Sequence, residues 1–99
     1  MAQTLDDAAV RAALSTLDGW TGDTAGLHWS VKLPDFPTAI AVVDEVAGVA
    51  EGMDHHPDID IRWRTLTFSC VTHSAGGVTD NDVRLAGQIR QIATGKGGH

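Results

Sequence analysis

The stretch DIDIRWRTLTFSCVTH, residues 58–73, decides the fold of this chain. Apolar side chains alternate with polar ones in both halves of the stretch, at Ile59, Ile61 and Trp63 and then at Leu66, Phe68 and Cys70. A period of two is typical of a strand that buries one face. The phase of the alternation changes at Arg64 and Thr65, as a tight hairpin at these residues would produce. The stretch therefore predicts two antiparallel strands joined at residues 64–65.

A second pair of strands is predicted upstream. In GLHWSVKLPDF, residues 26–36, the apolar side chains share one face: Leu27, Trp29, Val31 and Leu33. Trp20 is expected to begin the partner strand, across the loop TGDTAG. Pro34 ends the second strand because it lacks the N–H group that a sheet ladder needs.

The longest helical pattern lies between the two pairs of strands, in FPTAIAVVDEVAGVAEGMDHHP, residues 36–57. Its apolar residues recur at spacings of three or four, and the face they predict is Phe36, Ile40, Val43, Ala47, Ala50 and Met53. Pro57 disfavours the helical conformation at His56, so the helix should end near residues 54–56.

Two further helices are predicted at the ends of the chain. The first covers residues 5–17, where Thr4 and Asp7 have capping-box spacing. The last opens with Thr79 and Asp82, which have the same spacing. The glycine-rich residues 94–99 are expected to form a frayed, flexible tail. The predicted order is α-β-β-α-β-β-α in a single domain, residues 1–99. It is an α+β fold, with a four-stranded antiparallel sheet that carries its helices on one face.

Composition narrows the possible functions. The chain has 99 residues, a net charge of −6 and a pI near 5.0, which argue against nucleic acid or an anionic membrane as its partner. It has no apolar run of membrane-spanning length and no sign of a signal peptide at its N-terminus. Cys70 is the only cysteine, so no internal disulfide can form, and we expect a cytoplasmic protein. We expect Cys70 to be buried as a small hydrophobic residue.

The polar candidates for a functional site are Glu51, Asp54, His55, His56, His73 and Asp82. Histidines are suited to proton transfer near neutral pH and to metal binding. Each candidate also has a structural interpretation. The histidine pair can be a solvated helix end, His73 a surface residue at a strand end, and Asp82 only the capping acid of the last helix. Trp63 is most simply a core or interface residue.

Other chemistries have less support in the sequence. Adjacent histidines are poorly placed to bind one metal ion, and neither HxxxH nor HExxH occurs. There is no GxSxG motif for a serine nucleophile and no glycine-rich phosphate loop. We therefore expect no metal and no cofactor.

Two segments together resemble the pterin-4a-carbinolamine dehydratase family: AEGMDHHPDIDIRW, residues 50–63, and THSAGGVTDNDVRLA, residues 72–86. The resemblance rests on an acid, then three intervening residues and HHP, a downstream aromatic residue, a TH before a glycine-containing loop, and a late aspartate. It extends from about residue 17 to residue 89. The sequence departs from the family pattern at Gly52 and Met53, and it has Trp63 where tyrosine is common.

The resemblance implies that His55, His56 and His73 are catalytic, and that Glu51, Asp54, Trp63 and Asp82 bind the substrate. The implied enzyme is a lyase that removes water from 4a-hydroxytetrahydrobiopterin by histidine acid–base catalysis, in tetrahydrobiopterin recycling. A homodimer or homotetramer and a pterin-dependent hydroxylase are the implied partners. The alternative is a non-catalytic assembly factor or transcriptional dimerisation cofactor with the same fold. The three histidines favour the enzyme, because relatives of the second kind tend to lose them.

Overall fold

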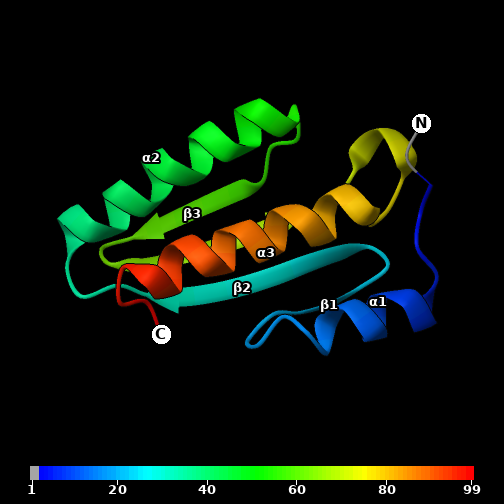
Figure 1. Cartoon of the computed structure of the whole chain (residues 1–99), viewed down its shortest axis with the longest axis horizontal. Helices are drawn as coiled ribbons and strands as arrows, with labels where there is room; N and C mark the ends of the chain where they lie inside the picture. Colours follow the sequence, from blue (N-terminus) through cyan, green and yellow to red (C-terminus); the bar gives the residue numbers. More distant parts are fainter. Residues whose placement is uncertain (1–2) are drawn as a thin grey trace.

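The computed structural model describes residues 3–99, which form three α-helices, four strands and one 3-10 turn (Figure 1). The elements follow one another as α1 (Asp7–Leu14), β1 (Thr21–Asp23), β2 (Gly26–Lys32), α2 (Phe36–Met53), β3 (Asp58–Arg62), β4 (Thr65–Cys70), η1 (His73–Ala75) and α3 (Asp80–Gly95). The predicted α+β fold and its order of helices and strands are confirmed.

The sheet is antiparallel throughout and has the strand order β1-β2-β4-β3. Arg62 pairs with Thr65, so the β3–β4 hairpin turns at Trp63 and Arg64, one residue earlier than predicted. Trp63 has a φ of 55°, in the left-handed region. The apolar alternation of β3 therefore ends at Ile61, and Trp63 belongs to the turn.

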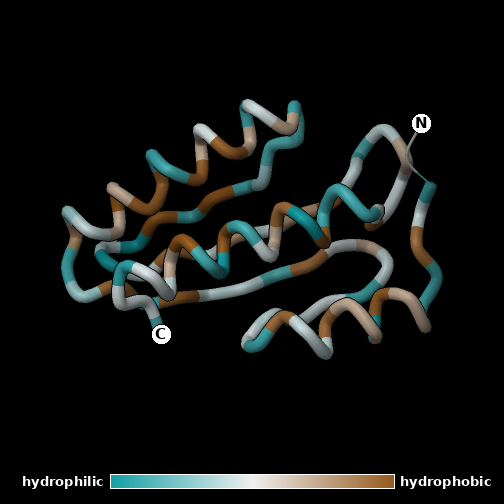
Figure 2. Tube along the Cα trace, viewed as in Figure 1, coloured by the Kyte–Doolittle hydropathy of each residue, from teal (hydrophilic) through white to brown (hydrophobic). Residues whose placement is uncertain are grey.

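One face of the sheet forms the core. Its central contacts are direct cross-strand pairs between β2 and β4: Leu27 with Cys70, Trp29 with Phe68, and Val31 with Leu66. All six side chains are buried, as is Trp20, whose ring stacks on that of Trp29. The opposite face of these two strands is polar, and there Ser30 is hydrogen-bonded to Thr67. The helices α2 and α3 pack against each other along the sheet, and hydrophobic positions recur along both of them (Figure 2).

The buried face of α2 differs from the predicted one. Its buried residues are Ala39, Val42, Val46 and Ala50. Phe36 and Ala47, which were predicted to face the core, are exposed, and Phe36 retains 46% of its accessible surface. The prediction was right for Ala50, which is buried, and for Val43 and Met53, which pack partly buried against the core. It was wrong for Phe36 and Ala47, because α2 is apolar around much of its circumference and the spacing of its apolar residues does not define a single face.

Two helix ends also differ from expectation. Asp6, rather than Thr4, caps α1 by accepting a hydrogen bond from the Ala9 N–H at 2.8 Å. The same helix stops at Leu14, where the hydroxyls of Ser15 and Thr16 donate to carbonyls of the last turn, so it is shorter than the predicted 5–17. Side chains of this kind compete with helix propagation.

The final residues add a short contact to the sheet. The helix α3 continues to Gly95, into the predicted tail, and the main chain of His99 then exchanges two hydrogen bonds with Lys32 of β2, at 2.9 and 3.0 Å. The glycines that suggested fraying therefore lie in a segment with its own main-chain partners. Within residues 3–99, no helix is both long enough and apolar enough to cross a membrane.

Candidate active site

His55 and Asp82 form the centre of the candidate site. They are 27 positions apart in the sequence, yet His55 Nε2 lies 2.5 Å from Asp82 Oδ1. His55 follows the end of α2, and Asp82 lies in the first turn of α3. The side chain of His55 is 11% exposed and that of Asp82 is fully buried, so water has little access to this contact.

The second carboxylate oxygen of Asp82 also has partners. Oδ2 accepts hydrogen bonds from the Thr79 N–H at 2.8 Å and from the Thr72 hydroxyl at 2.7 Å. The predicted capping box between Thr79 and Asp82 is confirmed. Because Asp82 also reaches His55 and Thr72, its side chain does more than cap α3.

The end of α2 sets the position of the histidine pair. Asp54 adopts the left-handed conformation, with a φ of 50° and a ψ of 43°. Its N–H returns to the last turn of the helix, and the N–H of His55 donates to the carbonyl of Ala50 at 3.0 Å. This is the geometry of a Schellman-type helix end, usually formed by glycine. The chain thus turns off the helix axis before His55 and Pro57.

The second histidine has a more exposed environment. His56 Nε2 lies 2.7 Å from Glu51 Oε2, and the two side chains are 57% and 79% exposed. Glu51 and His55 are four residues apart, a spacing that places two side chains on one face only where the helix continues through both. The helix α2 ends before His55, and Glu51 contacts His56 instead. The structure therefore gives each histidine of the pair its own carboxylate.

His73 is connected to this site through its neighbour in the sequence, because the hydroxyl of Thr72 contacts Asp82. It is exposed and opens η1, directly after Thr72. The end of α2, the turn η1 and the start of α3 lie together in Figure 1. They carry six of the predicted site residues: Glu51, Asp54, His55, His56, His73 and Asp82.

Trp63 lies elsewhere. It is in the β3–β4 turn, and the full length of β3 separates it from His56 (Figure 1). Its side chain is 70% exposed and lies under the guanidinium of Arg64, 4.8 Å from the ring centroid. The fold of one chain therefore does not bring Trp63 to the histidines.

Sequence reasoning did not single out Thr72. Its buried hydroxyl contacts Asp82, and it lies 2.7 Å from the Thr79 hydroxyl. The available signal was its place directly before His73. Cys70, two residues earlier, is buried as expected. Burial, together with the nearby charges of Asp82 and Asp58, raises the pKa of the Cys70 thiol to about 12.

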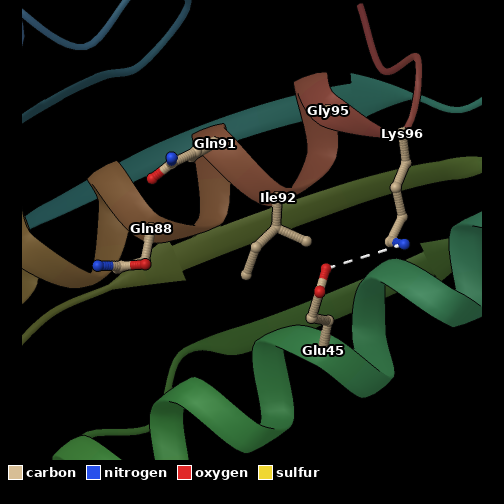
Figure 3. A pocket seen from close by; sticks show the side chains of 6 residues that line it. All are labelled: Glu45, Gln88, Gln91, Ile92, Gly95 and Lys96. Atoms are coloured by element: carbon tan, nitrogen blue, oxygen red, sulfur yellow. Dashed lines mark ion pairs between the residues drawn. The ribbon is translucent and has the colours of Figure 1, made fainter.

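Two surface hollows are lined by other residues. One, of about 420 Å³, lies between α2 and α3 and contains the ion pair of Lys96 with Glu45 at 3.9 Å (Figure 3). The other, of about 370 Å³, lies between residues 4–7, Thr24 and the glycines that follow η1. Among residues 3–99, no group of three or more histidine, cysteine, aspartate or glutamate side chains is arranged to hold a metal ion.

Comparison with known proteins gives a consistent family. The model of the family described as "Pterin 4 alpha carbinolamine dehydratase" matches residues 3–92. Proteins from Mycobacterium avium (53% identical over 88 residues; 89% of this chain, 94% of the relative) and Roseiflexus sp. (50% over 92 residues; 93% and 99%) are both named "Putative pterin-4-alpha-carbinolamine dehydratase".

Solved structures show the same fold. The crystal structure of a transcriptional coactivator/pterin dehydratase from Brucella melitensis superposes with a TM-score of 0.89 at 32% identity, over 92% of this chain and 99% of that one. A pterin dehydratase-like protein described as a RuBisCO assembly factor in the alpha-carboxysome shares the fold at 16% identity. Its TM-score is 0.62, over 75% of this chain and 86% of that one.

Proposed function

Because the chain belongs to the pterin 4 alpha carbinolamine dehydratase family, we propose that it removes water from a 4a-hydroxytetrahydropterin to give the quinonoid dihydropterin. The observation that carries this proposal is the contact between His55 and the buried Asp82, at the end of the fold that also carries His56 and His73. In the cellular context, the activity would recycle tetrahydrobiopterin for a pterin-dependent hydroxylase.

The reaction requires two proton transfers. One proton leaves N5 of the pterin and another reaches the departing 4a-hydroxyl group, so both an acid and a base are needed. We assign these roles to His55 and His73, and a contact with the ring or assistance in proton transfer to His56. Imidazoles suit both roles near neutral pH.

The carboxylates have supporting roles in the proposal. Asp82 orients His55 through the 2.5 Å contact, and Glu51 holds His56 through the 2.7 Å contact. Asp54 and Glu51 are exposed beside the histidines, so they can meet the polar edge of a pterin. Trp63 has no role in the site of a single chain, because it lies at the other end of β3.

The surface supports a second proposal, that the chain forms a homodimer or homotetramer. The edge strand β3 has no partner on its outer side within the described chain. Ile61 on this strand is 42% exposed, and Phe36 at the start of α2 is 46% exposed. An unpaired edge with exposed apolar side chains is suited to pairing with another copy. Size-exclusion chromatography with light scattering would give the mass directly, and a monomer at all concentrations would contradict this proposal.

The enzymatic proposal is tested by following the absorbance of chemically generated 4a-hydroxytetrahydropterin during dehydration. We expect wild-type protein to exceed buffer, and His55→Ala and His73→Ala each to lower turnover by roughly 10²-fold or more, as is typical for a lost acid or base. His28→Ala is the matched control, because this histidine is exposed on the polar face of β2 and contacts Ser69.

Two results would contradict the proposal. Wild-type protein that dehydrates the substrate no faster than buffer would favour the assembly-factor or dimerisation-cofactor interpretation. Turnover by His73→Ala close to that of wild type would remove His73 from the catalytic pair.

A further inference from the structure

We infer that Thr72 and Thr79 are positioning residues, which hold the Asp82 carboxylate so that His55 keeps its hydrogen on Nε2 and presents Nδ1 to the substrate. The effect on catalysis rests on the proposed function. The assignment of the tautomer rests only on the hydrogen bonds of this buried network, so the two can fail separately.

The first step of the argument is the inventory of acceptors on Asp82. Oδ2 accepts from the Thr79 N–H and the Thr72 hydroxyl, and Oδ1 faces His55 Nε2. An ionised carboxylate has no hydrogen to donate, so the hydrogen in the 2.5 Å contact belongs to Nε2. A neutral imidazole has only one N–H, which leaves Nδ1 of His55 as its free acceptor.

The second step concerns the two hydroxyl groups. Thr72 Oγ1 lies 2.7 Å from Asp82 Oδ2 and 2.7 Å from Thr79 Oγ1. Since Thr72 has a single hydroxyl hydrogen and the carboxylate only accepts, Thr72 donates to Asp82. The Thr79 hydroxyl must then donate to Thr72. The hydroxyls thus form a relay with one direction, from Thr79 through Thr72 to Asp82.

Burial makes this relay effective. Thr79 and Asp82 are fully buried, and Thr72 is 7% exposed. Water therefore cannot readily replace a missing hydroxyl, and a buried polar group that loses its partner is costly. Removing the Thr72 hydroxyl would leave Oδ2 with one donor and the Thr79 hydroxyl without its acceptor. Oδ2 would then be held by the Thr79 N–H alone, so the carboxylate and the His55 ring that it contacts would be less firmly oriented. Outer hydrogen-bond partners that orient a metal-bound histidine commonly matter by roughly 10- to 100-fold, and we expect an effect of the same order on His55.

The test uses two variants that separate the hydroxyl of Thr72 from its shape. Thr72→Val removes the hydroxyl and keeps the branched shape, whereas Thr72→Ser keeps the hydroxyl. Thr67→Val is the matched control, because its hydroxyl contacts Ser30 on the polar face of the sheet. The tautomer of each histidine is read from the ¹⁵N shifts of its ring nitrogens by NMR, at a pH where the rings are neutral.

We expect wild-type protein, Thr72→Ser and Thr67→Val to show His55 with its hydrogen on Nε2, and Thr72→Val to show a mixture of tautomers. In the dehydration assay, Thr72→Val should lower kcat roughly 10- to 100-fold with little change in KM, and Thr72→Ser should restore kcat. A purely structural role would not produce this split between the two variants.

Three results would overturn the inference. The first is a wild-type His55 with its hydrogen on Nδ1, which needs no variant and remains decisive if Thr72→Val fails to fold. The second is a Thr72→Val protein whose His55 keeps the wild-type tautomer. The third is a Thr72→Val protein with wild-type kcat, which would overturn the catalytic part alone. If wild-type protein lacks dehydratase activity, the proposed function fails, while the NMR result still decides the tautomer.

Discussion

Replacing Asp54 with glycine is expected to stabilise the protein. Asp54 adopts a left-handed conformation with a φ of 50°, at the residue that terminates α2. Asp54 is exposed, and none of the ion pairs found within residues 3–99 includes its carboxylate. The backbone contacts of this helix end use main-chain N–H groups, which glycine retains.

The size of the effect follows from two opposing contributions. A residue with a Cβ in the left-handed region costs roughly 1–2 kcal/mol, and aspartate lies at the low end because its short polar side chain tolerates this conformation. Glycine loses more backbone entropy on folding, which takes back roughly 0.5–1 kcal/mol. The expected net gain is therefore at most about 0.5 kcal/mol. For a domain of this size, that corresponds to a rise in Tm of at most roughly 2–4 °C.

The assay is thermal unfolding followed by circular dichroism, with denaturant unfolding as a check. Asp44→Gly is the matched control, because it makes the same substitution at an exposed position inside α2. There, glycine should destabilise by roughly 0.3 kcal/mol, the difference between the helix propensities of aspartate and glycine. If Asp54→Gly lowered Tm as Asp44→Gly does, the reasoning about the left-handed helix end would be refuted. The dehydration assay adds a separate readout, in which Asp54→Gly should raise KM if the carboxylate contacts the pterin.

Four further outcomes follow from the structure. Gly48→Ala should raise the free energy of unfolding by about 1 kcal/mol, because a Cβ at this position of α2 meets nothing within 4 Å; denaturant unfolding measures it. Since the pKa of Cys70 rises from 9.0 to about 12 on folding, stability should fall as pH increases from about 9 toward 12, by up to about 1.4 kcal/mol per pH unit, and Cys70→Ala should lack this part of the decline. Trp63→Gly should leave the dehydration rate unchanged, because Trp63 lies at the far end of β3; a large loss would show that it reaches a site. Glu51→Gln should lower turnover less than about fivefold, because exposed ion pairs contribute at most about 1 kcal/mol.

Elements that bury only one face were predicted better from the sequence than elements whose apolar residues lie on several sides. The strands β2 and β4 bury one face fully, while the other face is exposed in β2 and half-buried in β4, so a period of two predicted both their position and their inward residues. The helix α2 was correctly located but its buried face was not, because its apolar residues surround much of the helix. The predicted position of the hairpin turn was one residue too late. Trp63 continues the apolar alternation of β3 in the sequence, although in the structure it adopts a left-handed turn conformation.

The site was predictable only in its local parts. The motif gave the residue types, and the spacing of Thr79 and Asp82 predicted the capping box. The partner of each histidine could not be predicted, because His55 and Asp82 are 27 residues apart and meet only through the packing of α2 and α3. Glu51 contacts His56 rather than His55 for a local reason. The chain turns off the helix at Asp54, whereas the spacing argument assumes that the helix continues.

Asp82 joins the stability of the fold to the geometry of the site. The same carboxylate completes the first turn of α3 and contacts His55 and Thr72. Its removal would leave buried donors unpaired, so loss of activity in an Asp82 variant could reflect loss of structure alone. His55 can be substituted without removing the capping box of α3, because its side chain contacts Asp82 but is not part of the cap. A double-mutant cycle between His55→Ala and Thr72→Val therefore isolates the functional coupling better than any substitution of Asp82. Non-additive losses of turnover, with additive losses of stability, would identify coupling that serves catalysis rather than folding.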